Sequence, residues 1–170
     1  AAGDVARIDF SLGKIAYLSD VEPTQVTYPT EHELFLLEVW KYRKGTNSQN
    51  DPLRIGVRNY ERGLWIHSGT SLAWRLNREY RHLRGVAGIA AGIGESCVPT
   101  VGLVIRGDGR ELLSVPIARS DEPLELDVDI SGVRELQLEV TSTSPDGICE
   151  HLGLGDVRVI EFEDVVPGPG

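Results

Sequence analysis

The sequence contains no methionine, only two cysteines and no long apolar run. A conventional membrane helix needs roughly 20 consecutive apolar residues, so we expect no membrane insertion. The N-terminus also lacks the basic segment and following apolar stretch of a signal peptide. Because not even an initiator methionine is present, we expect Ala1 to begin a processed or excised fragment.

Basic residues are also scarce. The chain has 17 Lys and Arg against 26 Asp and Glu, which gives a formal charge of -9. This charge opposes attraction to nucleic acid or anionic membranes, and no basic block offsets it, so we exclude nucleic acid as a partner. The length of 170 residues, with 41% hydrophobic and 25% charged residues, is typical of one domain with a substantial core.

The two cysteines are Cys97 and Cys149, which permit one disulfide, although two buried free thiols would satisfy the same count. Cys97 follows a glycine-rich segment and Cys149 follows a Pro-Asp-Gly turn, so both lie in predicted loops. We favour the disulfide. Loop disulfides are typical of oxidising compartments, which predicts a secreted or cell-surface location.

Apolar residues recur at every second position along most of the chain. Residues 124–130 alternate apolar and acidic side chains, and residues 107–109, Gly-Asp-Gly, predict a hairpin whose glycines supply positive φ. Short strands separated by turn residues predict an all-β fold, an antiparallel β-sandwich. The other predicted strands are 15–18, 53–57, 72–76, 80–87, 101–105, 112–115, 136–140 and 157–162.

One segment departs from this period. Thr30-Glu31-His32-Glu33 has the spacing of a capping box, which predicts a short helical turn from about residue 31 to residue 38. We therefore divide the chain into an N-terminal extension or first strand (1–14), the sandwich (15–163) and a Pro/Gly linker or tail (164–170).

The segment from Tyr60 to Ser68 combines a turn glycine with Trp65 and His67 before further apolar residues. An indole face packs on apolar C–H surfaces, and an imidazole donates or accepts hydrogen bonds. This combination suits a neutral polyhydroxylated ligand at a binding rim. The alternative is that Trp65 and His67 are packing residues near the start of a strand.

Several motifs occur in a fixed order over most of the chain. They are Tyr17–Asp20, Leu53–Gly56 with Tyr60, Gly63–Ser68, Leu76 with Tyr80, Arg81 and Leu83, Gly88-Ile89, Gly107–Arg110, Val128–Gly132 with Glu135-Leu136, and His151 before Gly155–Val157. This order resembles that of the NPCBM-type carbohydrate-binding modules, accessory domains of secreted bacterial glycoside hydrolases and related cell-surface proteins. The resemblance implies a galactose-binding-like jelly roll with a lectin-like, non-catalytic role.

The chain departs from the family pattern at two places. Ala90 and Ala91 stand where the family usually has an acidic residue, and residues 152–155 lack the Trp that the family commonly has there. The alternative function is therefore an NPCBM-like structural or protein-interaction domain that has lost sugar binding.

Six residues are the predicted carbohydrate site, placed on loops at one end or edge of the sandwich. The Trp side chains offer stacking, and the His and Arg side chains offer hydrogen bonds to hydroxyl groups. The alternative for Trp40 is that it anchors the core, and the alternative for Glu150 and His151 is that they are a surface pair without a binding role. The module would bind a neutral glycan and target a fused or associated protein to it. In descending order, the site residues are Trp65, His67, Trp40, Arg43, Glu150 and His151.

Metal and catalytic signatures are weak. Residues 127–132 imitate the start of a calcium loop, but its twelfth position is Leu138 where a bidentate Glu is needed. No histidine pair has metalloprotease spacing, so no zinc site is predicted, while a structural calcium ion held by backbone carbonyls stays open. No nucleophile elbow or phosphate loop is present, which favours a protein that is not an enzyme.

Overall fold

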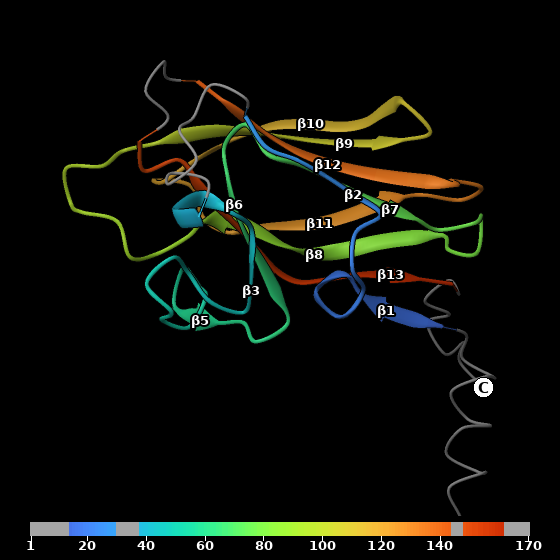
Figure 1. The fold of residues 1–170 in the computed structure, drawn as a ribbon, viewed down its shortest axis with the longest axis horizontal. Coiled ribbons are helices and arrows are strands. Elements are labelled where there is room, and N and C mark those ends of the chain that lie inside the picture. Colours follow the sequence, from blue (N-terminus) through green and yellow to red (C-terminus); the bar gives the residue numbers. More distant parts are fainter. Residues whose placement is uncertain (1–13, 30–37, 144–147, 162–170) are drawn as a thin grey trace, which may run out of the picture.

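The computed structural model describes residues 14–29, 38–143 and 148–161, and these form an antiparallel β-sandwich. Figure 1 shows the two sheets as stacked layers whose strands run along the long axis. This confirms the predicted all-β sandwich. Among the helices of the described ranges, none has the length and apolar character needed to cross a bilayer.

The first sheet has the strand order β11-β8-β13-β6-β3, and β1 pairs with β13. Its strands are β1 (Ile15–Tyr17), β3 (Arg43–Lys44), β6 (Gly63–His67), β8 (His82–Ile89), β11 (Leu124–Asp129) and β13 (His151–Ile160). β13 is central and pairs with β6 and β8 on its two sides. It therefore fixes the positions of both neighbours.

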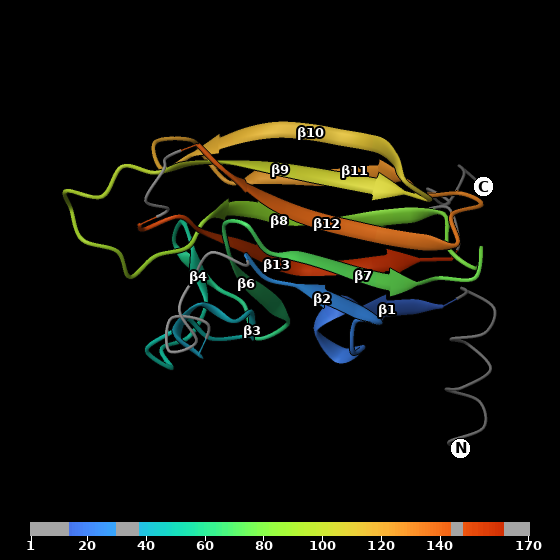
Figure 2. The ribbon, with the colours of Figure 1, turned by 45° about the horizontal axis from the view of Figure 1, so that its top comes forward.

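The second sheet has the order β10-β9-β12-β7-β2. Its strands are β2 (Gln25–Thr27), β7 (Ser71–Arg75), β9 (Thr100–Gly107), β10 (Arg110–Ala118) and β12 (Glu135–Ser142). Figure 2 shows this layer from a tilted view, with β10 along one edge and β2 along the other. A short hairpin of β4 (Arg54–Ile55) and β5 (Arg58–Asn59) lies outside both sheets.

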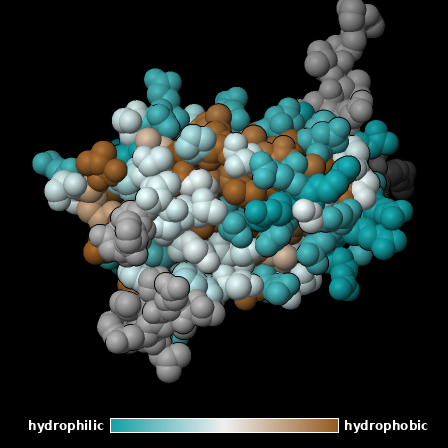
Figure 3. All heavy atoms as spheres, turned by 90° about the horizontal axis from the view of Figure 1, so that it is seen from above, coloured by the Kyte–Doolittle hydropathy of each residue, from teal (hydrophilic) through white to brown (hydrophobic). Residues whose placement is uncertain are grey.

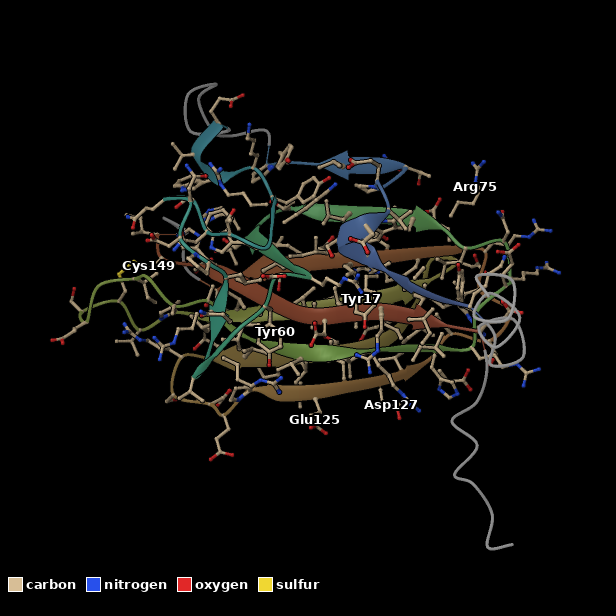
Figure 4. All side chains as sticks on the ribbon, turned by 90° about the horizontal axis from the view of Figure 1, so that it is seen from below. Tyr17, Tyr60, Arg75, Glu125, Asp127 and Cys149 are labelled. Carbon is tan, nitrogen blue, oxygen red and sulfur yellow. A yellow bond between two sulfur atoms is a disulfide. The ribbon has the colours of Figure 1, made fainter. Side chains whose placement is uncertain are left out.

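The core lies between the two sheets and follows from the period of two. In β12, Leu136, Leu138 and Val140 are buried, and the intervening residues are more exposed. In β11, Asp127 and Asp129 are exposed, as expected for the outer face of a strand. Figure 4 shows Glu125 and Asp127 at the outer margin of the first sheet.

Several sequence expectations need correction. Only residues 54 and 55 of the predicted strand 53–57 are in a strand, because the chain turns there into the β4–β5 hairpin. His151, expected in a loop, is the first residue of β13. In the Gly-Asp-Gly hairpin, Gly109 has positive φ as expected, but the other positive φ belongs to Asp108 and not to Gly107.

Some expectations fall largely or wholly on residues outside the described ranges. Of the predicted helical turn, only Glu38 is described, and residues 38–40 are helical. Residues 1–13 and the predicted tail at 164–170 also lie outside the described residues, so the proposed boundaries of the chain stay predictions.

A small third layer covers part of the outer face of the first sheet. Leu53, Ile55 and Tyr60, from the β4–β5 segment, form a second apolar cluster with Trp65 and Ala90. Figure 4, viewed from below, shows Tyr60 over the strands of the first sheet.

Glycines in the central strand make this approach possible. A Cβ at Gly155 would lie 2.6 Å from ring atoms of Tyr60, and a Cβ at Gly153 would lie 2.8 Å from Ile55. Real Cβ atoms do not approach neighbours so closely. The glycines of β13 therefore leave the space into which the third layer packs.

Substituting Gly155 with Ala should destabilise the protein by about 1–3 kcal/mol, because the added methyl group overpacks against Tyr60. Gly94→Ala is the matched control, since the only atom near that position is 4.0 Å away, and it should change stability by less than about 0.5 kcal/mol. Denaturant unfolding of both variants measures the difference. Equal stabilities would contradict the packing account.

Candidate functional site

Three ring-bearing residues meet on the outer face of the first sheet. Trp65 and His67 are two residues apart in β6, so they project from the same face, and His151 in β13 is the register partner of His67. The ring centroids of Trp65 and His151 are 4.5 Å apart, and those of His67 and His151 are 5.0 Å apart. Two strands distant in sequence thus build one aromatic cluster.

The segment before β6 adds two further predicted residues. Trp40, in the helical turn at 38–40, stacks on His67 with ring centroids 4.1 Å apart and an interplanar angle of 11°. Arg43, in β3, is the register partner of Trp65. Its Nη2 donates a hydrogen bond to the Glu38 carbonyl at 3.2 Å. The structure therefore places Trp40 and Arg43 at the same cluster.

The two histidines are linked through their Nδ1 atoms, which are 3.1 Å apart. A hydrogen bond at this distance requires one Nδ1 to carry a proton and the other to offer its lone pair. Burial lowers the pKa of His151 from 6.5 to about 4. His151 is therefore neutral at pH 7 and is suited to accept the proton of His67.

Burial corrects the expectation of an exposed rim. Trp65 and His67 are each 1% exposed, and so is Glu150. The covering third layer and the stacked Trp40 account for the burial around β6. Trp65, His67 and Glu150 therefore cannot be the groups that first meet a ligand. Trp40, Arg43 and His151 are only partly buried and keep access to solvent.

Glu150 connects this cluster to the disulfide. Its backbone carbonyl accepts a hydrogen bond from the Ser68 N–H at 2.9 Å, which ties the end of β6 to the start of β13. The preceding residue, Cys149, is bonded to Cys97, with Cα atoms 6.0 Å apart. Arg119 also donates to the carbonyls of Gly94 and Cys97. The loop that carries Cys97 is thus fixed beside the aromatic cluster.

A hollow of about 350 Å³, with both polar and apolar residues in its lining, lies in the neighbouring loops, and sequence reasoning missed it. Its wall is joined to the aromatic cluster through backbone hydrogen bonds, because the Ala90 N–H donates to the His151 carbonyl and the Ala91 N–H to the Arg54 carbonyl. The signal was the run of polar residues at 46–51, between Gly45 and Pro52. The lining residues are Asn47, Asp51, Pro52, Arg54, Asn59, Ala91 and Gly92.

The hollow combines the groups that bind hydroxyls. Asn47 is held by its own loop, since its Oδ1 accepts hydrogen bonds from the N–H groups of Gln49 and Asp51. A guanidinium, carboxamides and a carboxylate are present together, as donors and acceptors for a neutral polar molecule. A volume of a few hundred Å³ is within the range of small-ligand sites, about 300–1,000 Å³.

The described residues contain no group of three or more His, Cys, Asp or Glu side chains placed to hold a metal ion. In the calcium-like segment, Asp127 lies 3.4 Å from Arg84 and 3.5 Å from His82. Asp129 accepts a hydrogen bond from the Ser131 N–H at 2.9 Å. These acidic side chains are engaged with the protein itself.

Comparison with family models gives a match to the NPCBM/NEW2 domain over residues 14–160. A search of the curated proteins found no match. Among solved structures, the chain is similar to the second CBM51 module with INT domains of Clostridium perfringens ZmpB, solved in complex with GlcNAc. The TM-score is 0.74 at 18% identity, over 87% of this chain and 32% of that one. The chain thus spans about a third of that structure's length.

Two further structures show the same fold. The CBM51 of Clostridium perfringens GH95, in complex with methyl-galactose, has a TM-score of 0.71 at 14% identity, covering 86% of this chain and 99% of that chain. The tandem CBM51 modules of Sp3GH98 from Streptococcus pneumoniae SP3-BS71 give 0.70 at 15% identity, covering 87% and 47%. At these identities the likeness shows a common fold.

Acidification should destabilise the protein through His151. Its pKa is about 4 in the folded chain and 6.5 in the unfolded chain, so between these values only the unfolded chain binds the proton. The free energy of unfolding is therefore unaffected by the protonation of His151 above pH 6.5. It decreases as the pH falls from 6.5 towards 4, by up to about 3 kcal/mol. This loss is measured from the unfolding free energies of the wild type and of His151→Asn at pH 7 and pH 4.5. The Asn side chain keeps a polar group near the position of Nδ1 but does not titrate in this range. Parallel pH profiles would show that His151 is not responsible.

The disulfide should leave no reactive thiol in the unfolded, unreduced protein, whereas two reactive thiols would refute it. The cysteines are 52 residues apart, so reduction should lower stability by about 4 kcal/mol through the larger entropy of the unfolded chain. Thiol titration in denaturant tests the bond, and unfolding with and without reductant tests its contribution. A Cys97→Ser/Cys149→Ser variant should unfold like the reduced protein and be insensitive to reductant.

Proposed function

Because the chain belongs to the NPCBM/NEW2 domain family, we propose that it is a non-catalytic module that binds a neutral glycan and targets an attached secreted enzyme or surface protein to it. The single observation that carries the proposal is the grouping of Trp40, Arg43 and His151, partly exposed, around buried rings at one end of the sandwich. Two solved structures of the same fold are complexes with GlcNAc and with methyl-galactose.

The buried residues act as support in this proposal. Trp65 and His67 hold the rings of His151 and Trp40, respectively, in fixed orientations. Preorganised side chains lose less conformational entropy when a ligand binds. Glu150 fixes the strand that presents His151 through its bond to Ser68. In this proposal the six residues have different roles: Trp40, Arg43 and His151 contact the glycan, and Trp65, His67 and Glu150 position them.

The hollow lined by Asn47 and Arg54 extends the proposed surface. A sugar offers apolar C–H faces and hydroxyl groups, which match an indole and a set of amide, carboxylate and guanidinium groups. Arg54 is exposed and lines the hollow, and its Nε donates to the Gly56 carbonyl at 3.2 Å, a bond that does not use its terminal nitrogens. We assign Arg54 a hydroxyl-binding role.

The targeting role follows from weak binding combined with attachment. A shallow site makes few contacts and binds modestly, but a tether to an enzyme raises that enzyme's local concentration at the glycan. The disulfide supports a secreted or surface location for the proposed module.

A second candidate is a domain for protein assembly without sugar binding. Two positions that depart from the family pattern favour this second function, because Ala90 is 1% exposed and Leu152 is fully buried. Their side chains contribute to packing and leave no polar group there for a sugar. The two functions separate by direct binding measurement.

Replacing the exposed residues should reduce glycan binding while the fold is retained. Trp40→Ala should weaken binding about tenfold or more, equivalent to ~1.4 kcal/mol, through loss of the stacking face. Arg43→Gln and Arg54→Gln remove charged donors and should each weaken binding several-fold. A glycan array with calcium present identifies the ligand, and titration calorimetry then gives the affinities.

Two variants at the far end of the sandwich serve as controls: Tyr80→Ala removes an aromatic ring, and Arg110→Gln removes a guanidinium. Both should bind as the wild type does. Trp65→Ala and His67→Ala should lose binding together with stability, because both residues are buried. A blank array with folded wild-type protein would favour the assembly function instead.

A further inference from the structure

The end of the sandwich opposite the disulfide has a different chemistry. Figure 4 shows Cys149 and Arg75 at opposite ends of the molecule. In Figure 3 hydrophilic side chains gather at the end that carries the β9–β10 turn. A hollow of about 760 Å³ lies there, lined by Arg75, Asn77, Arg78, Asp108, Arg134 and Glu135.

Backbone hydrogen bonds between three turns fix the walls of this hollow. The N–H groups of Leu76 and Asn77 donate to the Arg134 carbonyl at 2.6 Å and 3.2 Å, and the Arg78 N–H donates to the Val133 carbonyl at 3.1 Å. These bonds join the β7–β8 turn to the β11–β12 turn. The backbone that carries the arginines is thus fixed by hydrogen bonds, although their side chains are exposed.

The Asp108 carboxylate joins the third turn to this frame. Its Oδ1 accepts hydrogen bonds from the N–H groups of Arg134 at 3.0 Å and Glu135 at 2.9 Å. One carboxylate of the hollow is therefore committed to the backbone. Arg75 is the register partner of Glu135, the second carboxylate.

The three guanidiniums form no salt bridge with a described carboxylate, although Arg134 and Arg78 lie close enough to the Asp108 carboxylate to help lower its pKa, after the backbone hydrogen bonds from Glu135 and Arg134. Among the described residues, no carboxylate lies within 4.0 Å of the side-chain nitrogens of Arg75, Arg78 or Arg134. With three guanidiniums and two carboxylates, the hollow has a formal excess of one positive charge on a chain of net charge -9. Grouped arginines without salt-bridge partners are a typical binding site for anions, because each guanidinium can bind an oxyanion through two parallel hydrogen bonds.

Arg78 also occupies an unusual backbone position. Asn77 and Arg78 have φ values of 55° and 63°, and the turn is closed by a hydrogen bond from the Glu79 N–H to the Leu76 carbonyl at 3.1 Å. Two successive left-handed residues are the signature of a type I′ turn, in which Asn followed by Gly is the favoured pair. Asn stands in its favoured place, but an arginine replaces the glycine. Arg78 thus places a long cationic side chain at a position where the left-handed backbone favours glycine.

We propose that this hollow is a second binding site, specific for the sulfate or carboxylate groups of an acidic polysaccharide. Arg75, Arg78 and Arg134 bind the anionic group, and the Asn77 amide binds an adjacent hydroxyl. A polysaccharide is favoured over an acidic protein because the site is a hollow and not a flat surface, and because the chain belongs to a carbohydrate-binding family. The site is independent of the neutral-glycan surface at the other end.

The test compares three polysaccharides as probes: chondroitin sulfate, polygalacturonate and an uncharged galactan. Titration calorimetry in 50 mM salt should detect binding of the wild type to at least one of the two acidic polymers, weakened at least threefold in 200 mM salt as the guanidinium contacts are screened. Binding to only one polymer identifies the sulfate or the carboxylate as the ligand group. Binding to neither would overturn the proposal, whatever the galactan does.

The variants separate a site from general attraction. Arg78→Gln and Arg134→Gln should each weaken binding of the acidic polymer at least fivefold. Arg110→Gln makes the same charge change in the nearby hairpin but outside the hollow, and it should weaken binding less than twofold. Equal losses in Arg110→Gln and Arg78→Gln would overturn the proposal in favour of unspecific attraction.

Arg78→Gly adds a readout that a structural role would not give. Glycine relaxes the left-handed backbone, so this variant should raise Tm by about 3 °C while it loses affinity for the acidic polymer. A variant that binds like the wild type would show that the guanidinium does not contact the ligand. Binding of the galactan should be unaffected in all these variants, so failure of this proposal is distinct from failure of the neutral-glycan proposal.

Discussion

The close approach of the third layer to the central strand is the constraint on which the candidate site depends. Gly153 and Gly155 present no side chain on the outer face of β13, and Ile55 and Tyr60 fill that space. The layer buries the part of the outer face around β6 and β13 that would otherwise face water. It encloses Trp65 and leaves the residues at its margin partly exposed.

Burial then determines the chemistry of the two histidines. An imidazole in water has a pKa near neutrality, whereas one that is desolvated keeps its proton less readily. A hydrogen bond between the Nδ1 atoms at 3.1 Å requires one Nδ1 without a proton, and the neutral His151 ring meets this requirement in the tautomer that carries its proton on Nε2. The same covering layer thus keeps the cluster rigid and holds the His151 ring in its neutral form at pH 7.

Two of the departures from the family pattern, Ala90 and Leu152, have a physical explanation in this structure. Ala90 contacts the apolar cluster of the third layer, and Leu152 lies in the core between the sheets, where Ile66 is its register partner. A polar group at either position would be buried and would need a partner. Polar groups appear instead around the hollow near Asn47 and Arg54. Polar binding groups are therefore available beside the aromatic cluster despite the alanines.

The amino-acid sequence by itself determined the sheets, because a period of two places apolar side chains on one face of each strand, as in β11 and β12. The side-chain chemistry of six residues also indicated them as candidates for the binding site. Only the tertiary structure decided which of them face solvent. Trp65 is buried because Leu53, Ile55 and Tyr60, remote from β13 in sequence, pack against the glycine-lined face of that strand. The period of the sequence indicates the face of the sheet on which a residue lies. Whether that face is buried depends on packing between segments distant in the sequence, which no local pattern encodes.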